Sequence, residues 1–168
     1  MNKVKSFAKI NLALHVTGKL AKLHKIESIV KFIKLHDSIT IKKIKSKKHK
    51  IIFNGRFSTN INKDNTVVKL FNILEDQKLL KNQRFQIKIK KNIPQEAGLG
   101  GGSMNAANIL NFLIKKKFIK LNQKKILKIA NSIGSDVILG INPTSTVLSS
   151  KNLIKRFLES PQFHTLLV

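Results

Sequence analysis

Apolar and polar residues alternate near the start of the chain, from residue 8 to residue 16. Every even position in this stretch is apolar, while the odd positions include Lys9, Asn11 and His15. Because successive side chains of a strand point to opposite faces, the pattern predicts a half-buried strand. We expect the even face, from Ala8 to Val16, to pack on the core, and the other face to present a lysine, an amide and an imidazole to a groove.

Three later segments also carry strand patterns. Residues 37–44 and 51–53 resemble strands, and the lysine-rich run 45–50 between them predicts a hairpin loop. In residues 84–90 apolar and polar side chains alternate again, and Pro94 stops the strand's hydrogen-bonding ladder.

Helical spacing appears in three places. Asp64 is a plausible cap for a first helix, whose apolar residues stand three and four apart. A second helix is predicted over residues 104–118, and a third begins at Asn122 and ends at Gly134 in a left-handed conformation. Strands mixed with amphipathic helices indicate an α+β or α/β fold, and their order alone does not decide the topology.

Length and composition narrow the class of protein. The 168 residues suffice for one domain with a real core. The chain has no cysteine, which excludes disulfides, thiolate metal sites and a cysteine nucleophile. The sequence contains neither a signal-peptide pattern nor an apolar run long enough to span a membrane, so we expect a soluble, cytoplasmic protein without membrane partners.

The formal net charge of +25 would attract phosphates, nucleic acid or acidic lipid. However, the basic residues are almost all lysines spread along the chain, and tryptophan and tyrosine are absent. Base readout and stacking usually use arginine and aromatic residues. The composition therefore favours an AT-biased genome over a dedicated nucleic-acid surface.

Four glycines and a serine fill residues 98–103, between a predicted strand and a predicted helix. A backbone without side chains can approach a polyphosphate closely, and the helix start adds unpaired amides and the positive end of its dipole. This order favours phosphate binding over a mobile surface loop. The segment is neither a Walker loop nor a dinucleotide fingerprint, because the residues that define those motifs do not follow it.

Single polar residues are more ambiguous. Taken alone, Lys9 is better explained as a solvated lysine on an exposed sheet face than as a functional residue, and Asp136 as a cap for the next segment. His15 and His24 have no partners at metal-ligand spacing, so substrate hydrogen bonding is favoured over a metal site. Ser103 lacks the elbow motif of serine hydrolases.

Three blocks in order, at residues 8–12, 94–103 and 134–137, resemble the GHMP kinases, and more narrowly the diphosphocytidyl-methylerythritol kinases. Residues 14–18 and 23–28 match two further stretches of that family, and the glycine loop matches its pattern from Gly98 to Ala107 except at Met104. The resemblance covers roughly the first 140 residues. It implies a two-layer α+β domain like domain 2 of ribosomal protein S5, over residues 1–150.

The resemblance also implies a reaction: transfer of the ATP γ-phosphate, with Mg²⁺, to the 2-hydroxyl of 4-diphosphocytidyl-2-C-methyl-D-erythritol, in isoprenoid precursor synthesis. Asp136 would take or orient the hydroxyl proton beside Lys9. Asn11 and His24 would contact the acceptor. No separate metal-binding residues are implied. The residues expected to bind ATP are Pro94, Gly98, Leu99, Gly100, Gly101, Gly102 and Ser103.

The chain departs from the family pattern in several places. Leu23 replaces a tyrosine expected to stack on cytosine, a role that Phe32 could take, and Met104 replaces a serine that could contact phosphate or magnesium. Ile138 replaces a proline. Family members continue into a ferredoxin-like domain, of which residues 151–168 would be only the beginning or a linker. Two alternatives remain: a basic domain that binds nucleic acid or the ribosome, and an inactive remnant.

Overall fold

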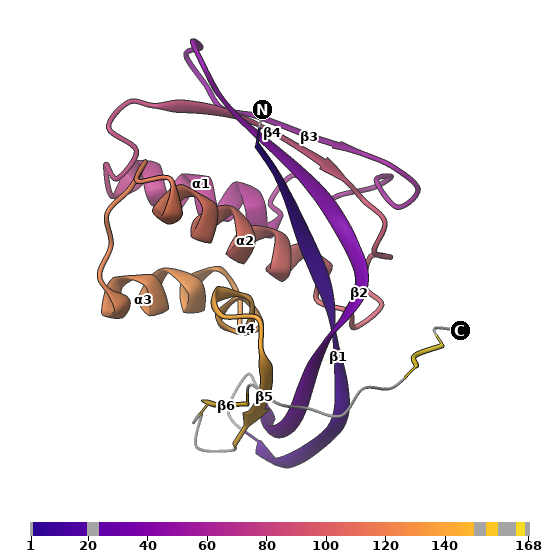
Figure 1. Ribbon diagram of the computed structural model, residues 1–168. Coiled ribbons are helices and arrows are strands. Elements are labelled where there is room, and N and C mark those ends of the chain that lie inside the picture. The colour runs from indigo at the N-terminus through magenta and orange to yellow at the C-terminus, as the bar shows by residue number, and fades with distance from the viewer. Residues whose placement is uncertain (1, 20–23, 150–153, 158–163, 167–168) are drawn as a thin grey trace.

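The computed structural model describes residues 2–19, 24–149, 154–157 and 164–166. Within these residues one six-stranded sheet carries its helices on a single face, as Figure 1 shows. The two layers confirm the predicted α+β class. The strands are β1 (Asn2–Lys19), β2 (His24–Ile44), β3 (Lys50–Asn54), β4 (Arg84–Lys90), β5 (Ser145–Leu148) and β6 (Ile154–Phe157), and the helices are α1 (Thr66–Asp76), α2 (Gly101–Lys115), α3 (Gln123–Ile133) and α4 (Val137–Ile141).

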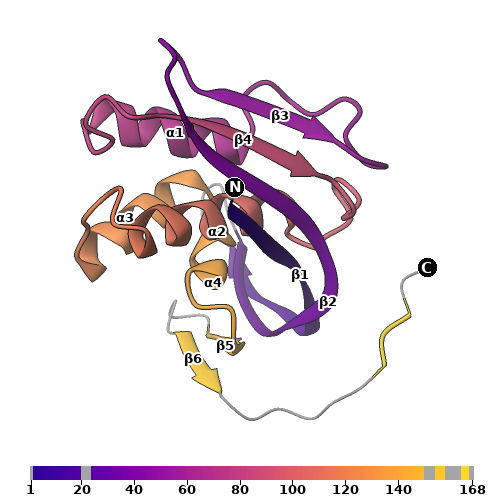
Figure 2. The same cartoon turned by 45° about the horizontal axis from the view of Figure 1, so that its top comes forward.

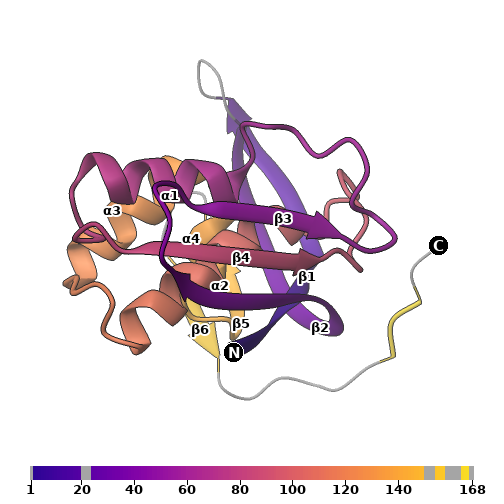
Figure 3. The ribbon, with the colours of Figure 1, turned by 90° about the horizontal axis from the view of Figure 1, so that it is seen from above.

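The long strand β2 organises the sheet. Strand β1 runs antiparallel along one edge of β2, while β4 and β5 pair with different halves of its other edge. Strand β3 is parallel to β4, so β3, β4 and β2 lie side by side in Figure 3. In Figure 2, β5 and β6 lie at the end of the sheet away from β3.

The predicted hairpin across residues 45–50 is wrong, because β4 lies between β2 and β3. The apolar residues of β4 explain its inner position. Phe85, Ile87 and Ile89 are fully buried, whereas Ile52 of β3 remains 40% exposed. The more apolar strand takes the covered position, and β3 becomes the edge strand.

The prediction that all even positions of residues 8–16 in β1 pack on the core is wrong. Ala8 is fully buried, but Leu12, Leu14 and Val16 are 47%, 52% and 60% exposed. The pairing of β1 with β2 shifts register at three places, and each irregularity re-aims the side chains that follow. One result is that Ala8 and its neighbour Lys9 are both buried.

Local capping residues set the helix boundaries. The side chain of Asn65, rather than Asp64, caps α1 by accepting hydrogen bonds from two first-turn amides, and Asp64 instead lies 3.3 Å from the ammonium of Lys69. Asn122 caps α3 as predicted. Gly134 also ends α3 as predicted, but its φ of 171° is extended, so the expected left-handed conformation is wrong. No helix in the described part of the chain is long and apolar enough to cross a membrane.

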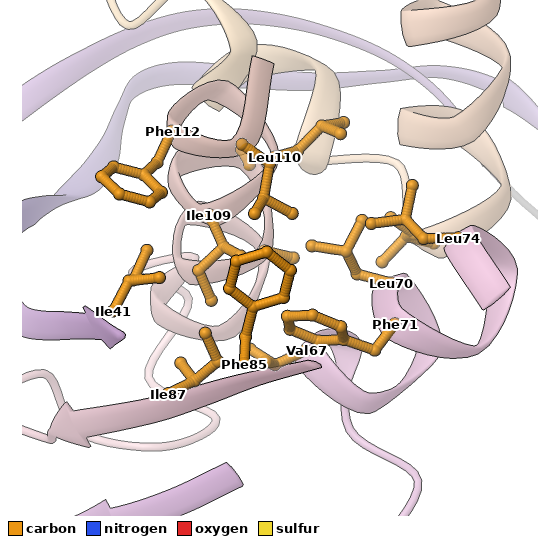
Figure 4. Close-up of a cluster of buried hydrophobic side chains, with 14 of the residues drawn as sticks. Ile41, Val67, Leu70, Phe71, Leu74, Phe85, Ile87, Ile109, Leu110 and Phe112 are labelled. Atoms are coloured by element: carbon orange, nitrogen blue, oxygen red, sulfur yellow. The ribbon is translucent and has the colours of Figure 1, made fainter. Parts of the chain in front are cut away.

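The main core lies between the sheet and helices α1 and α2 (Figure 4). Apolar side chains from β2 and β4 meet those of both helices, which holds α2 against the sheet. The start of α2 is therefore fixed relative to the strand ends. The labelled residues are Ile41, Val67, Leu70, Phe71, Leu74, Phe85, Ile87, Ile109, Leu110 and Phe112.

The imidazole of His49 packs at the edge of this core, against Phe71 and Phe85. His49 Nδ1 accepts a hydrogen bond from the Phe85 amide at 3.0 Å, and its Nε2 lies 3.2 Å from Glu75 Oε1. The ring also stacks on Phe85. Because burial disfavours the charged form, the pKa of His49 is lowered from its usual value.

Candidate functional site

A cavity of about 510 Å³ opens where β1, the glycine loop and the starts of α1, α2 and α4 meet. Its size is that of an ordinary small-molecule site. It brings together Lys9 and Asp136 with every residue predicted to bind ATP, although these segments are far apart in the sequence.

The glycine loop is attached to β1 through the main chain. The Lys9 amide donates a hydrogen bond to the Leu99 carbonyl at 3.0 Å, and the Leu99 side chain is buried. Helix α2 then begins at Gly101, three residues earlier than predicted, so its first amides belong to the loop itself. Because first-turn amides have no acceptor within the helix, this end of the cavity offers donors and the positive end of a dipole to an anion.

Two glycines are required by close approach. Gly100 has a φ of +67°, and a Cβ there would lie 2.9 Å from Lys9 Cγ and 3.7 Å from Asp136 Oδ2. A Cβ on Gly101 would lie 3.1 Å from Lys91 Nζ. The absence of a side chain at Gly100 therefore leaves room for Lys9 and Asp136. The absence of one at Gly101 leaves room for Lys91, which lies behind the loop.

Lys9 and Asp136 form an ion pair, with 3.4 Å between Lys9 Nζ and Asp136 Oδ2. The Lys9 side chain is 9% exposed, which excludes the solvated surface lysine considered above, while that of Asp136 is 35% exposed. Asp136 precedes α4, yet its carboxylate accepts no hydrogen bond from the helix. The capping role is therefore excluded too, and the carboxylate remains open to the cavity.

The residues predicted to contact the acceptor do not all lie at the cavity. Asn11 Oδ1 accepts a hydrogen bond from Lys9 Nζ at 2.6 Å, so Asn11 extends the ion pair. Phe32 lies across the strand pair from Lys9 but packs on an apolar cluster and does not line the cavity. The side chain of His24 and the whole of Leu23 lie outside the described residues.

Met104 occupies the position of the second loop serine, but its side chain points away from the cavity. It is fully buried in a cluster with Val30 and Leu139. A Cβ on Gly140 of α4 would lie 3.0 Å from its sulfur. Met104 therefore helps α2 to pack on α4.

Sequence reasoning missed a buried polar cluster that supports the loop. Asp37 is fully buried and forms an ion pair with Lys91. It also accepts hydrogen bonds from the amides of Asn92 and Ile93 at 2.7 and 2.9 Å, and from Asn105 Nδ2 at 2.8 Å. The cluster ties the end of β4 to the first turns of α2. One signal was available: only eight acidic residues occur in the chain, and Asp37 stands in an otherwise apolar and basic stretch.

The far wall of the cavity was also missed. It is formed by residues around the start of α1, including Asn65, Thr66 and Lys69. Thr66 Oγ1 donates a hydrogen bond to the Gly102 carbonyl at 2.7 Å, which joins this wall to the loop. The cavity therefore extends well beyond the loop. Nothing in the sequence distinguished these residues from an ordinary polar helix start.

Comparison with known proteins finds relatives of this chain. Residues 65–147 match the family described as GHMP kinases N terminal domain. The 4-diphosphocytidyl-2-C-methyl-D-erythritol kinase of Pelagibacter ubique (strain HTCC1062) is 59% identical over 164 residues, which cover 98% of this chain and 58% of that protein. The protein of the same name from Petrotoga mobilis is 34% identical, covering 93% of this chain and 59% of its own length.

A solved structure shows the same fold. The crystal structure of 4-(cytidine 5'-diphospho)-2C-methyl-D-erythritol kinase matches with a TM-score of 0.73 at 22% identity, over 93% of this chain and 55% of that one. The chain thus spans somewhat more than half the length of the relatives it matches.

Proposed function

We propose that this chain is the nucleotide-binding part of a small-molecule kinase, because its residues 65–147 match the family of GHMP kinase N-terminal domains. Its acceptor is 4-diphosphocytidyl-2-C-methyl-D-erythritol, phosphorylated by ATP on the 2-hydroxyl. The names of the Pelagibacter and Petrotoga relatives support this acceptor. The observation that carries the proposal is the pair of Lys9 and Asp136, which meets beside Gly100 at a glycine-lined cavity.

The cavity suits the phosphates of ATP. The first residues of α2 line it, so their first-turn amides can approach an anion there. The wall around Asn65 and Thr66 leaves space for the rest of the nucleotide. A volume of about 510 Å³ is of the size that holds a ligand of this class.

Magnesium, when bound with ATP, would neutralise charge on the phosphates. The described residues contain no group of three histidine, cysteine or acidic side chains that could hold a metal ion by themselves. Mg²⁺ commonly binds through substrate phosphates with one or two carboxylates. Of the residues that line the cavity, Asp136 is the carboxylate nearest to Gly100 and Lys9.

In the proposed reaction the Asp136 carboxylate accepts the proton of the acceptor hydroxyl and directs its oxygen at the γ-phosphate. The Lys9 ammonium, 3.4 Å away, fixes the carboxylate and presents positive charge to the phosphoryl oxygens. Most of the acceleration comes from holding the two reactants in line. Asn11 and His24 remain our predicted contacts to the acceptor, with His24 toward its cytidine end.

Nucleotide binding is the first test, by calorimetric titration of this chain with ATP and with adenosine. We expect ATP to bind more tightly than adenosine. Gly101→Val should reduce that difference, because its side chain would meet Ile93 and Lys91 and displace the first amides of α2. Equal affinity for the two ligands in the unsubstituted chain would refute a phosphate site.

Phosphoryl transfer is the second test, measured as ADP release with and without the acceptor. Release should require the acceptor, and Asp136→Asn should abolish it while leaving ATP affinity nearly unchanged. ADP release that ignores the acceptor would overturn the substrate assignment. ATP binding without transfer would reduce the proposal to a nucleotide-binding domain.

A further inference from the structure

Behind the ion pair lies a buried hydroxyl that no part of the proposed reaction uses. Ser28 of β2 is 3% exposed. Its Oγ accepts a hydrogen bond from Asn11 Nδ2 at 2.6 Å and donates one to the Ala13 carbonyl at 2.8 Å. Asn11 Oδ1 in turn accepts from Lys9 Nζ at 2.6 Å. A continuous chain of contacts therefore runs from the β-strand backbone to the ammonium.

The direction of this chain follows from its donors and acceptors. A lysine ammonium has only donors, so Asn11 must turn its oxygen to Lys9. The amide nitrogen then faces Ser28, which must receive that bond on a lone pair. The hydroxyl proton is left for the Ala13 carbonyl, whose place is set by the strand. Only this arrangement satisfies every group.

We propose that Ser28 is a positioning residue, which holds the Asn11 amide in the orientation that places the Lys9 ammonium beside Asp136. Its importance for catalysis rests on the function proposed above for Lys9. Ser28 is well suited to the task because both edges of β2 are paired at this point, with Leu14 of β1 and Leu148 of β5. A hydroxyl fixed in a doubly paired strand can restrain a longer side chain.

Without the hydroxyl, the amide nitrogen of Asn11 loses its acceptor, and the chain of hydrogen bonds from Ala13 to Lys9 is broken. Asn11 can then rotate, and Lys9 keeps only its contact with Asp136. One neutral hydrogen bond is typically worth about fivefold in an equilibrium. We therefore expect the Lys9 ammonium to leave its site about five times more often in Ser28→Ala than in the unsubstituted chain.

Competitive acetylation of lysines, quantified by mass spectrometry, measures this release. Ser28→Ala should raise the labelling rate of Lys9 about fivefold. Ser28→Thr keeps the hydroxyl and should restore the slow rate, and Ser38→Ala, on an exposed position of the same strand, should leave it unchanged. Lys91, whose side chain is 5% exposed in its ion pair with Asp37, reports general loosening. An unchanged Lys9 rate in Ser28→Ala, or an equal rise at Lys91, would overturn the inference.

A measurement on the unsubstituted chain covers the case in which Ser28→Ala does not fold. Nuclear magnetic resonance should find slow solvent exchange for the Asn11 side-chain NH₂, compared with that of exposed Asn82. Equally fast exchange would refute the fixed amide. Failure of the kinase proposal looks different: ATP would then fail to bind, while the Ser28 effects on Lys9 and Asn11 would remain.

Discussion

Replacing Gly100 by alanine tests whether the absence of a side chain there positions Lys9 beside Asp136, the pair proposed to act in catalysis. Gly100 has a φ of +67°, and a Cβ there would lie 2.9 Å from Lys9 Cγ and 3.2 Å from Lys9 Cε. Gly98 offers a matched control, since its φ is +69° but a Cβ would meet nothing within 4 Å. Both substitutions place alanine in the same strained backbone region, but only one pushes on Lys9.

The shared cost can be estimated. A left-handed alanine costs about 1–2 kcal/mol, partly offset by the smaller entropy of the unfolded chain. Both variants should therefore lose about 1 kcal/mol of unfolding free energy. The additional effect belongs to Gly100→Ala. Carbon atoms rest about 3.5–4.0 Å apart, so Lys9 must move by up to about 1 Å, and a displacement of that size can cost about 100-fold in rate.

Urea denaturation measures the first effect, and ADP release at saturating ATP measures the second. We expect similar losses of stability in the two variants. Gly98 is itself predicted to bind ATP, so its substitution can weaken ATP binding, but at saturating ATP the large loss of transfer rate should occur in Gly100→Ala. Lys9 acetylation provides a readout that is independent of activity and should rise only in that variant. If the two variants show equal transfer rates and equal labelling, Gly100 does not position Lys9.

Three further substitutions test other parts of the fold. Asp37→Ala leaves the Lys91 ammonium buried without its partner and should lower the unfolding free energy by about 3–5 kcal/mol in urea denaturation; a loss under about 1 kcal/mol would contradict a structural role. Gly140→Ala brings a Cβ to 2.6 Å from that of Ala107 and 3.0 Å from the Met104 sulfur, so it should lower the thermal midpoint. An unchanged midpoint would contradict this close packing of α2 and α4. Because burial lowers the pKa of His49, its contribution to stability is complete above the usual histidine pKa of about 6.5 and is lost as pH falls below that value. His49→Gln should flatten this part of the curve of unfolding free energy against pH, and an unchanged slope would contradict the assignment.

Local signals in the sequence predicted the helices and the glycine loop well. Asn122 caps α3 as expected, and the loop stands between a strand and a helix as its residues indicated. Capping and glycine chemistry act over a few residues, so they can be read from the chain directly. Even here the prediction was one residue off: Asn65 caps α1, whereas the adjacent Asp64 pairs with Lys69.

Predictions of burial and strand pairing that depended on distant strands failed. The expected burial of Leu14 and Val16 assumed regular alternation, whereas irregular pairing with β2 interrupts it. The hairpin at residues 45–50 failed because β4, from much later in the chain, takes the place between its strands. The support of the loop by Asp37 and Lys91 was missed for the same reason. Lys91 is one of many lysines, and only the folded structure shows that it pairs with Asp37.

The arrangement around β2 has a consequence for synthesis on the ribosome. Lys9 lies on the strand along one edge of β2, whereas Asp136 leads through α4 into β5, which closes the other edge. Asp136 is therefore held beside Lys9 only once the chain has been made at least as far as β5.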